Sequence, residues 1–265
     1  MDRHTQRLAT MDSIYLAFAF IIPVVIMYII YIAMEIHPFG DGSVLVLDLN
    51  GQYVYFYEAL RRFIYGDASL LYSFSRALGG EFMGIYAYYV ASPFSYIVAL
   101  FPQTKMLEAL LFIFLLKTGL SGFTFGFYIH KTGKSRSKIA TVIFSCMYAL
   151  SAYAIVQQHN SMWIDALIWL PIITYAIEQL IKYGKFRMYV VFLALTLASH
   201  FYIGYMVCIF TSLYFFYYYF AKSGNGENNL TGERPHLLRS LGRMLLFSAI
   251  GLLIAAAVIC PAYVS

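Results

Sequence analysis

Repeated apolar runs of about 20 residues constrain this chain more than any other feature, because a run of that length matches the thickness of a membrane. Hydrophobic residues make up 61% of the sequence, charged residues only 12%, and the mean hydropathy is +0.70. A soluble domain carries about twice that charged fraction. The sequence therefore predicts an all-α, polytopic transmembrane helical bundle of about seven spans. The spans are expected at residues 15–34, 106–128, 139–156, 162–181, 188–200, 203–220 and 244–262.

The distribution of lysine and arginine predicts which side each connector faces, because basic residues accumulate in cytoplasmic loops. With residues 1–14 in the cytoplasm and residues 82–101 kept outside, 13 of the 18 basic residues face inward. If 82–101 crossed, two basic connectors would face outward instead. Pro93 and Gly84 also favour a broken, surface-lying segment. We therefore expect a multi-pass protein of the cell membrane, with a cytoplasmic N-terminus, an outer loop at 35–105 and a helical bundle at 106–265.

The outer loop has the composition of juxtamembrane helices. Four apolar residues repeat at helical spacing and predict a helix lying in the membrane interface; they are Tyr53, Phe56, Leu60 and Ile64. On its other face, Glu58 is expected to form an ion pair with Arg61 or Arg62. The later part of the loop is rich in tyrosine, which concentrates where an apolar body meets wet headgroups.

Two classes of site are disfavoured. The three cysteines lie inside apolar runs, and the spacing of His159 and Asp165 is unlike that of metal ligands, so no metal site built by the protein is expected. The net charge of +5 does not indicate nucleic acid, because the basic residues orient membrane spans.

Six motifs follow one another along the chain. They are DLNGQY at 48–53, SFSRALGG at 73–80, GIYAYYVASPF at 84–94, LKTGLSG at 116–122, NSMWIDALIWLP at 160–171 and FYIGYM at 201–206. In this order they resemble the bacterial YfhO membrane-protein family, and the resemblance covers essentially the whole chain. Members of that family are several times longer, which implies that this chain is the N-terminal part. His200 departs from the asparagine expected before the Phe-Tyr pair, so no role is transferred to it.

The resemblance implies a GT-C type glycosyltransferase, with a large first outer loop that carries the catalytic aspartate. Such an enzyme would transfer a sugar from a polyprenyl-phosphate carrier to an envelope polymer, such as lipoteichoic acid, in a Gram-positive bacterium. Its partners would be membrane lipids, the lipid-linked donor and the polymer acceptor. Two alternatives stay open: a transporter or flippase for a lipid-linked envelope precursor, and an inactive N-terminal fragment of the enzyme.

Asp48 is the catalytic candidate. Glycosyl transfer needs a general base for the acceptor hydroxyl, or a carboxylate that holds a metal near the leaving phosphate. A divalent cation therefore stays open as a cofactor. The same DLNG sequence also suits a solvated turn.

Lys117 lies within a predicted span, where an unpaired ammonium is costly. It would neutralise the carrier phosphate or pair with Asp165. The arginines of the outer loop would bind phosphate by bidentate hydrogen bonds or contact headgroups. The glycine pair suits a close backbone approach or a sharp turn. The remaining residues expected to contact substrate are Gln52, Tyr53, Arg61, Arg62, Arg76, Gly79, Gly80, Tyr88, Tyr89, His159 and Trp163.

Overall fold

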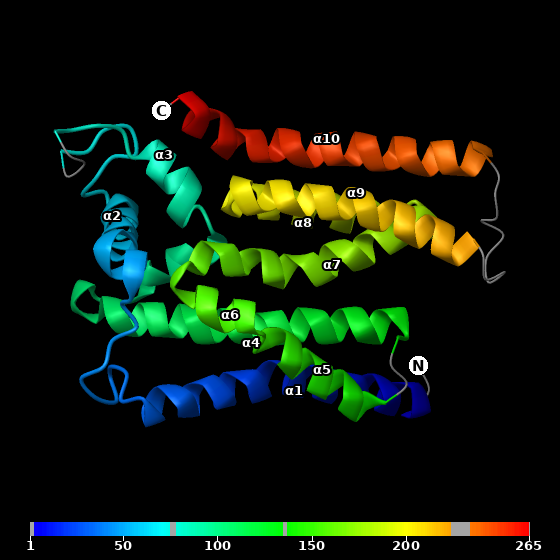
Figure 1. Ribbon diagram of the computed structural model, residues 1–265, viewed down its shortest axis with the longest axis horizontal. Coiled ribbons are helices and arrows are strands. Elements are labelled where there is room, and N and C mark those ends of the chain that lie inside the picture. Colours follow the sequence, from blue (N-terminus) through cyan, green and yellow to red (C-terminus); the bar gives the residue numbers. More distant parts are fainter. Residues whose placement is uncertain (1–2, 75–77, 135–136, 224–233, 265) are drawn as a thin grey trace.

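The computed structural model describes residues 3–74, 78–134, 137–223 and 234–264, and it confirms the all-α architecture. The long helices lie side by side with their axes roughly parallel (Figure 1). They are α1 (Arg3–Ala33), α4 (Met106–Thr132), α7 (Ser161–Tyr183), α9 (Phe201–Ser223) and α10 (Arg234–Val264). Shorter helices complete the bundle: α5 (Lys138–Ala149), α6 (Ala152–Val156), η5 (Gln157–His159) and α8 (Arg187–Ser199).

Five of the described helices are long and apolar enough to cross a membrane, and two bent helix pairs raise that number to seven if each pair is one span. One pair, Lys138–Ala149 with Ala152–His159, bends by 41°, and the other, Met83–Val90 with Pro93–Leu100, bends by 98°. The seven spans expected from sequence instead include α8, which has only 13 residues. A helix of that length is about 20 Å long, well short of the apolar core of a bilayer.

The sharply bent pair consists of α3 (Met83–Ile85), η2 (Tyr86–Val90) and η3 (Pro93–Leu100). At the bend, the backbone N–H of Phe94 donates to Ser92 Oγ at 3.2 Å, and Pro93 opens η3 without an N–H of its own. Figure 1 shows this segment at the end of the bundle that also holds α2 (Val54–Ile64) and the start of α4. The bent segment therefore begins and ends at the same end of the bundle.

Helix α2 lies across that end of the bundle, and a π-helical stretch, η1 (Leu49–Tyr53), precedes it. Tyr53 of η1 and Tyr57 and Leu60 of α2 are buried, whereas Ile64 is 39% exposed. The expected apolar face was thus wrong at its last position. Segment η3 packs against α2, and Tyr57, which the sequence pattern did not select, belongs to the same buried cluster as Val98 of η3.

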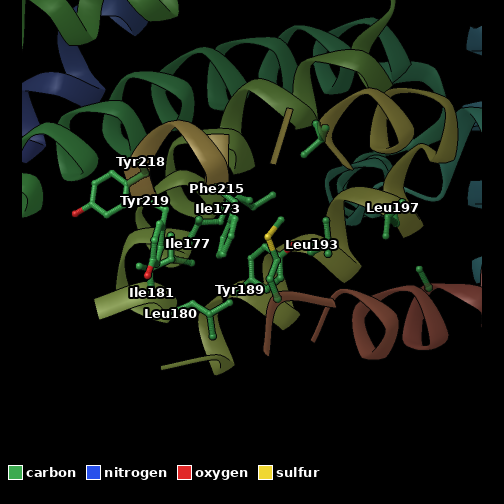
Figure 2. Close-up of a cluster of buried hydrophobic side chains, with 14 residues drawn as sticks. Ile173, Ile177, Leu180, Ile181, Tyr189, Leu193, Leu197, Phe215, Tyr218 and Tyr219 are labelled. Atoms are coloured by element: carbon green, nitrogen blue, oxygen red, sulfur yellow. The ribbon is translucent and has the colours of Figure 1, made fainter. Parts of the chain in front are cut away.

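Of three buried apolar clusters among the described residues, the two larger ones join most of the helices. The outer cluster joins η1 and α2 to η2, η3, the first half of α4 and Met162 at the start of α7. The second cluster joins α7, α8, α9 and α10; Figure 2 shows its side chains, among which Tyr189 and Phe215 are fully buried. The segment between α1 and α4, which contains η1, α2, η2 and η3 and is called the outer segment after its expected location, is therefore packed onto the bundle through apolar contacts.

Helix α4 is central, because it packs against α1, α5 and α7. Its glycines allow α1 to approach closely: a Cβ on Gly122 would lie 2.3 Å from the backbone oxygen of Ala19, and one on Gly119 would lie 2.7 Å from Phe20. Small residues serve the same purpose at helix contacts inside membranes.

Candidate functional site

Asp48 directly precedes η1 and is exposed at the end of the bundle. The hydroxyl of Tyr53 donates to its Oδ2 at 3.3 Å. Burial, together with the negative charge of Asp48, raises the pKa of Tyr53 well above its usual range. The phenol therefore stays protonated at neutral pH and can hold the carboxylate in place.

A chain of aromatic contacts links the Asp48 region to the start of α7. Tyr53 packs on Tyr89, with ring centroids 5.1 Å apart, and Tyr89 contacts Tyr88 at 4.7 Å. Tyr88 meets His200 edge-on at 4.5 Å, and the His200 ring lies 6.4 Å from Trp163. Residues that the sequence separates by more than a hundred positions thus share one aromatic wall.

Lys117 and Asp165 form a buried ion pair between α4 and α7. Lys117 Nζ lies 2.6 Å from Asp165 Oδ1, and both side chains are only 2% exposed. The ammonium also donates to the backbone oxygen of Ser161 at 2.7 Å and to its Oγ at 2.9 Å. Phe94 from η3 covers the group at 5.4 Å. Of the two expected roles of Lys117, pairing with Asp165 is the one the structure has.

Arg61 and Arg62 point to different places. Arg61 Nε donates to the backbone oxygen of Phe101 at 3.1 Å, and its guanidinium lies 4.7 Å from the centre of the Tyr65 ring. The expected ion pair with Glu58 is wrong: among the described residues, Glu58 accepts a hydrogen bond from Gln103 of η4 (Gln103–Lys105), the short helix before α4.

Arg62 is exposed and lines a pocket of about 520 Å³ between α2 and the segment that follows it. The other side chains that line this pocket include aromatic rings and two carboxylates, namely Tyr55, Glu58, Asp67, Tyr72 and Phe74. This pocket lies within the outer segment. Arg62, unlike Arg61, is therefore placed to meet a ligand.

The remaining candidates of the outer segment are less closely tied to a site. Gln52 is exposed on η1. Gly79 has a φ of +102°, and Gly80 exchanges two backbone hydrogen bonds with Ser73, at 2.7 and 3.1 Å. The glycine pair therefore builds a turn. Arg76 lies outside the described residues.

His159 has a structural role at the start of α7. Its Nδ1 lies 3.0 Å from the backbone oxygen of Val156, and its Nε2 lies 3.0 Å from Asn160 Nδ2. Both ring nitrogens are thus engaged when Nδ1 donates and Nε2 accepts. The expected contact of His159 with substrate stays a prediction.

Comparison with known proteins shows the family of this chain. The family model "Bacterial membrane protein YfhO" matches residues 19–265. The chain belongs to the YfhO family. It is also similar to "Uncharacterized protein YfhO" of Bacillus subtilis (strain 168), with 27% identity over 167 residues, 57% of this chain and 19% of the relative. This YfhO-family chain thus spans about a fifth of that relative's length. No solved structure matches it.

Sequence reasoning missed one buried carboxylate of this YfhO-family chain. Glu178 on α7 is 5% exposed and accepts hydrogen bonds from Tyr214 at 2.7 Å and Tyr128 at 3.3 Å. Lys134 Nζ lies 3.3 Å from the same oxygen. Its position inside the predicted span at 162–181 was the available signal, because a carboxylate at membrane depth needs partners.

The His200 ring is buried and has a hydrogen-bond partner for one of its nitrogens. His200 accepts a hydrogen bond from the backbone N–H of Ile203 at its Nδ1, at 3.1 Å, and is 2% exposed.

Over the described parts of the chain, no group of three or more His, Cys, Asp or Glu residues gathers where it could hold a metal ion. A cation at Asp48 would therefore need oxygen ligands from substrate phosphate or water.

Proposed function

We propose that this YfhO-family protein is an integral-membrane glycosyltransferase of the GT-C type. It transfers a sugar from a polyprenyl-phosphate carrier to an envelope polymer, such as lipoteichoic acid, on the outer face of the membrane. The observation that carries the proposal is the placement of Asp48: an exposed carboxylate, held by Tyr53, at the rim of an aromatic wall that reaches α7.

This placement suits glycosyl transfer. The carboxylate of Asp48 takes the proton of the acceptor hydroxyl as that oxygen attacks the anomeric carbon. The bond between the anomeric carbon and the carrier phosphate breaks, and the phosphate leaves with the bonding electron pair. In the alternative role, Asp48 would instead hold a divalent cation that stabilises that leaving charge. An exposed aspartate is open to both reactants from the membrane surface.

The basic connectors support an outer location. The end of α4, with Lys131, and the connector that follows it, with Lys134, lie at the same end of the bundle as the start of α1 (Figure 1). The α2 end is opposite. By the positive-inside rule, the basic end faces the cytoplasm, and Asp48 then faces outward. A lipid-linked donor in the outer leaflet would meet Asp48 and the pocket of Arg62.

An experiment in cells tests the proposal. The gene is deleted and replaced by versions encoding the wild-type chain, Asp48→Asn or Asp41→Asn, and glycosylation of the envelope polymer is measured by mass spectrometry. Asp41 is the matched control, because it is also exposed in the outer segment. Asp48→Asn should abolish glycosylation while membrane insertion and the Asp41→Asn strain stay normal. Wild-type glycosylation by Asp48→Asn would exclude Asp48 as the base.

One observation favours a second candidate, a transporter or flippase for a lipid-linked precursor. The Lys117–Asp165 pair is a buried charge pair inside the bundle, a feature of transport pathways. The glycosyltransferase requires sugar transfer to the acceptor. The flippase requires movement of the labelled lipid between leaflets without transfer.

A further inference from the structure

A cavity with basic walls lies beside the connector between α7 and α8, at the end of the bundle opposite α2 (Figure 1). Its volume is about 560 Å³, and its walls come from the second half of α7, the connector and the first turn of α8. The residues that line it are Tyr175, Gln179, Gly184, Lys185, Phe186, Arg187 and Met188. The proposed glycosyl transfer does not use this cavity.

The cavity has positive charge and no carboxylate in its walls. Lys185 and Arg187 are exposed, and neither forms an ion pair within the described parts of the chain. Residues 179–226 contain no aspartate or glutamate, and Glu227 and Glu233 lie outside the described residues. A concave wall that holds charges of one sign concentrates the field and attracts the opposite charge. The cavity is therefore suited to an anion.

Helix α10 fixes the connector and adds a third positive charge beside it. The guanidinium of Arg243 lies against Gly184, where an added Cβ would be 2.7 Å from Nη1 and 3.1 Å from Cζ. Phe186 stacks on Phe247 of α10, with ring centroids 4.2 Å apart and planes 4° from parallel. The connector is thus held on both sides of Lys185, and the cavity is part of the packed bundle.

The polar groups of the walls are suited to phosphate oxygens. The half-buried side chains of Tyr175 and Gln179 have no hydrogen-bond partner among the described residues. Together with the Lys185 ammonium and the Arg187 guanidinium, they offer N–H and O–H donors from four residues. A phosphate accepts several such bonds at once, and a guanidinium can bind two of its oxygens in parallel.

The position of the cavity indicates where that phosphate comes from. The apolar helix Ser161–Tyr183 is long enough to cross a membrane, and the connector begins directly after it. The cavity therefore lies at the depth of lipid headgroups. Phe186 and Met188 are 40% and 36% exposed there and provide apolar surface for the start of an acyl chain. A basic pocket between membrane helices is the kind of site that binds anionic headgroups.

We propose that this cavity binds the headgroup of an anionic phospholipid, from the leaflet that the basic end of the bundle faces. Lys185 and Arg187 bind the phosphate, and Tyr175 and Gln179 donate to the remaining headgroup oxygens. By the positive-inside rule, the leaflet is the cytoplasmic one. The site is separate from the proposed glycosyl transfer and stands without it.

Lipid titration of the purified full chain tests the site. The protein in detergent is titrated with dioleoyl phosphatidylglycerol, and the bound lipids are counted by native mass spectrometry. Dioleoyl phosphatidylcholine is the matched lipid, because it has the same chains and a phosphate but no net charge. We expect one phosphatidylglycerol to bind about tenfold more tightly than phosphatidylcholine. Inorganic phosphate at the same concentration should not displace it.

Substitutions assign the binding to this cavity. Lys185→Gln and Arg187→Gln should each weaken phosphatidylglycerol binding about fivefold, and the double variant about 25-fold. Arg187→Lys keeps the charge and should stay within about threefold of the parent. Lys138→Gln is the matched control, because it removes the same charge at the same end of the bundle. The Lys138 ammonium lies 5.3 Å from the centre of the Tyr15 ring, outside the cavity, so its removal should change binding less than about twofold.

Four results would overturn the inference. Parent-like binding of phosphatidylglycerol by a folded double variant would exclude the cavity. Equal weakening by Lys138→Gln would mean that the lipid responds to net charge alone. Equal affinity for phosphatidylcholine would show that the anionic headgroup is not selected. Displacement of the lipid by an equal concentration of inorganic phosphate would make the cavity a site for free phosphate.

Discussion

The Asp165 carboxylate lies 2.6 Å from the Lys117 ammonium, with each side chain 2% exposed. Ser161 supplies two further oxygens to that ammonium from α7, and Phe94 covers it from η3. Three separate parts of the chain therefore meet at one buried charge. A pair with this geometry fixes how α4, α7 and the returning outer segment sit relative to one another.

Breaking the Lys117–Asp165 pair should destabilise the bundle. Lys117→Met or Asp165→Asn leaves an uncompensated buried charge, which costs about 3–5 kcal/mol. The double variant should cost clearly less than the sum of the two, because it leaves no lone charge. Unfolding in detergent micelles measures all four proteins. Strict additivity would show that the two groups do not act as a pair.

Glu178 and its partners Tyr128, Lys134 and Tyr214 should stabilise the end of the bundle opposite α2. Tyr214→Phe removes the 2.7 Å hydrogen bond to the Glu178 carboxylate and should cost about 1.5–3 kcal/mol, since a bond to a charged group is lost. Tyr217→Phe is the matched control, because Tyr217 lies on the same helix and is 68% exposed. Its effect should stay within about 0.5 kcal/mol. Equal effects in the same unfolding measurement would contradict a role for the cluster.

Cysteine labelling tests the path of the outer segment. Ser69→Cys and Thr104→Cys, both exposed, flank the bent segment, and Tyr183→Cys lies at the end of α7. Each is introduced after the three native cysteines are changed to alanine. A membrane-impermeant maleimide on intact cells should label residues 69 and 104, and reach residue 183 only after permeabilisation. Labelling of 69 and 104 from opposite sides would mean that the bent segment crosses.

The helices were largely predictable from sequence, because apolar length and connector charge are local properties. The run at 188–220 turns at His200, close to where the sequence predicted a break. Phase within a helix was less predictable: α2 buries Tyr57 in a cluster that includes Val98 of η3, and that cluster joins segments far apart in sequence.

Site geometry depended on the same long-range contacts. The pairing of Lys117 with Asp165 could be suggested, because two opposite charges in apolar runs need each other. Glu178 was not recognised, since its partners Tyr128 and Tyr214 belong to other helices and look like ordinary apolar positions. His200 was set aside on sequence grounds. Only its bond to Ile203 shows that Nδ1 accepts, so that the neutral ring carries its proton on Nε2.

Sugar transfer by the purified protein tests the central claim most directly. The full chain is reconstituted in liposomes with a labelled polyprenyl-phosphate sugar and purified lipoteichoic acid, and label on the polymer is counted for wild type, Asp48→Asn and Asp41→Asn. The account predicts labelled polymer with wild type and Asp41→Asn, and a loss of at least about a hundredfold with Asp48→Asn, as for removal of a general base. Equal labelling by Asp48→Asn and wild type, or translocation of the lipid with no labelled polymer, would contradict it.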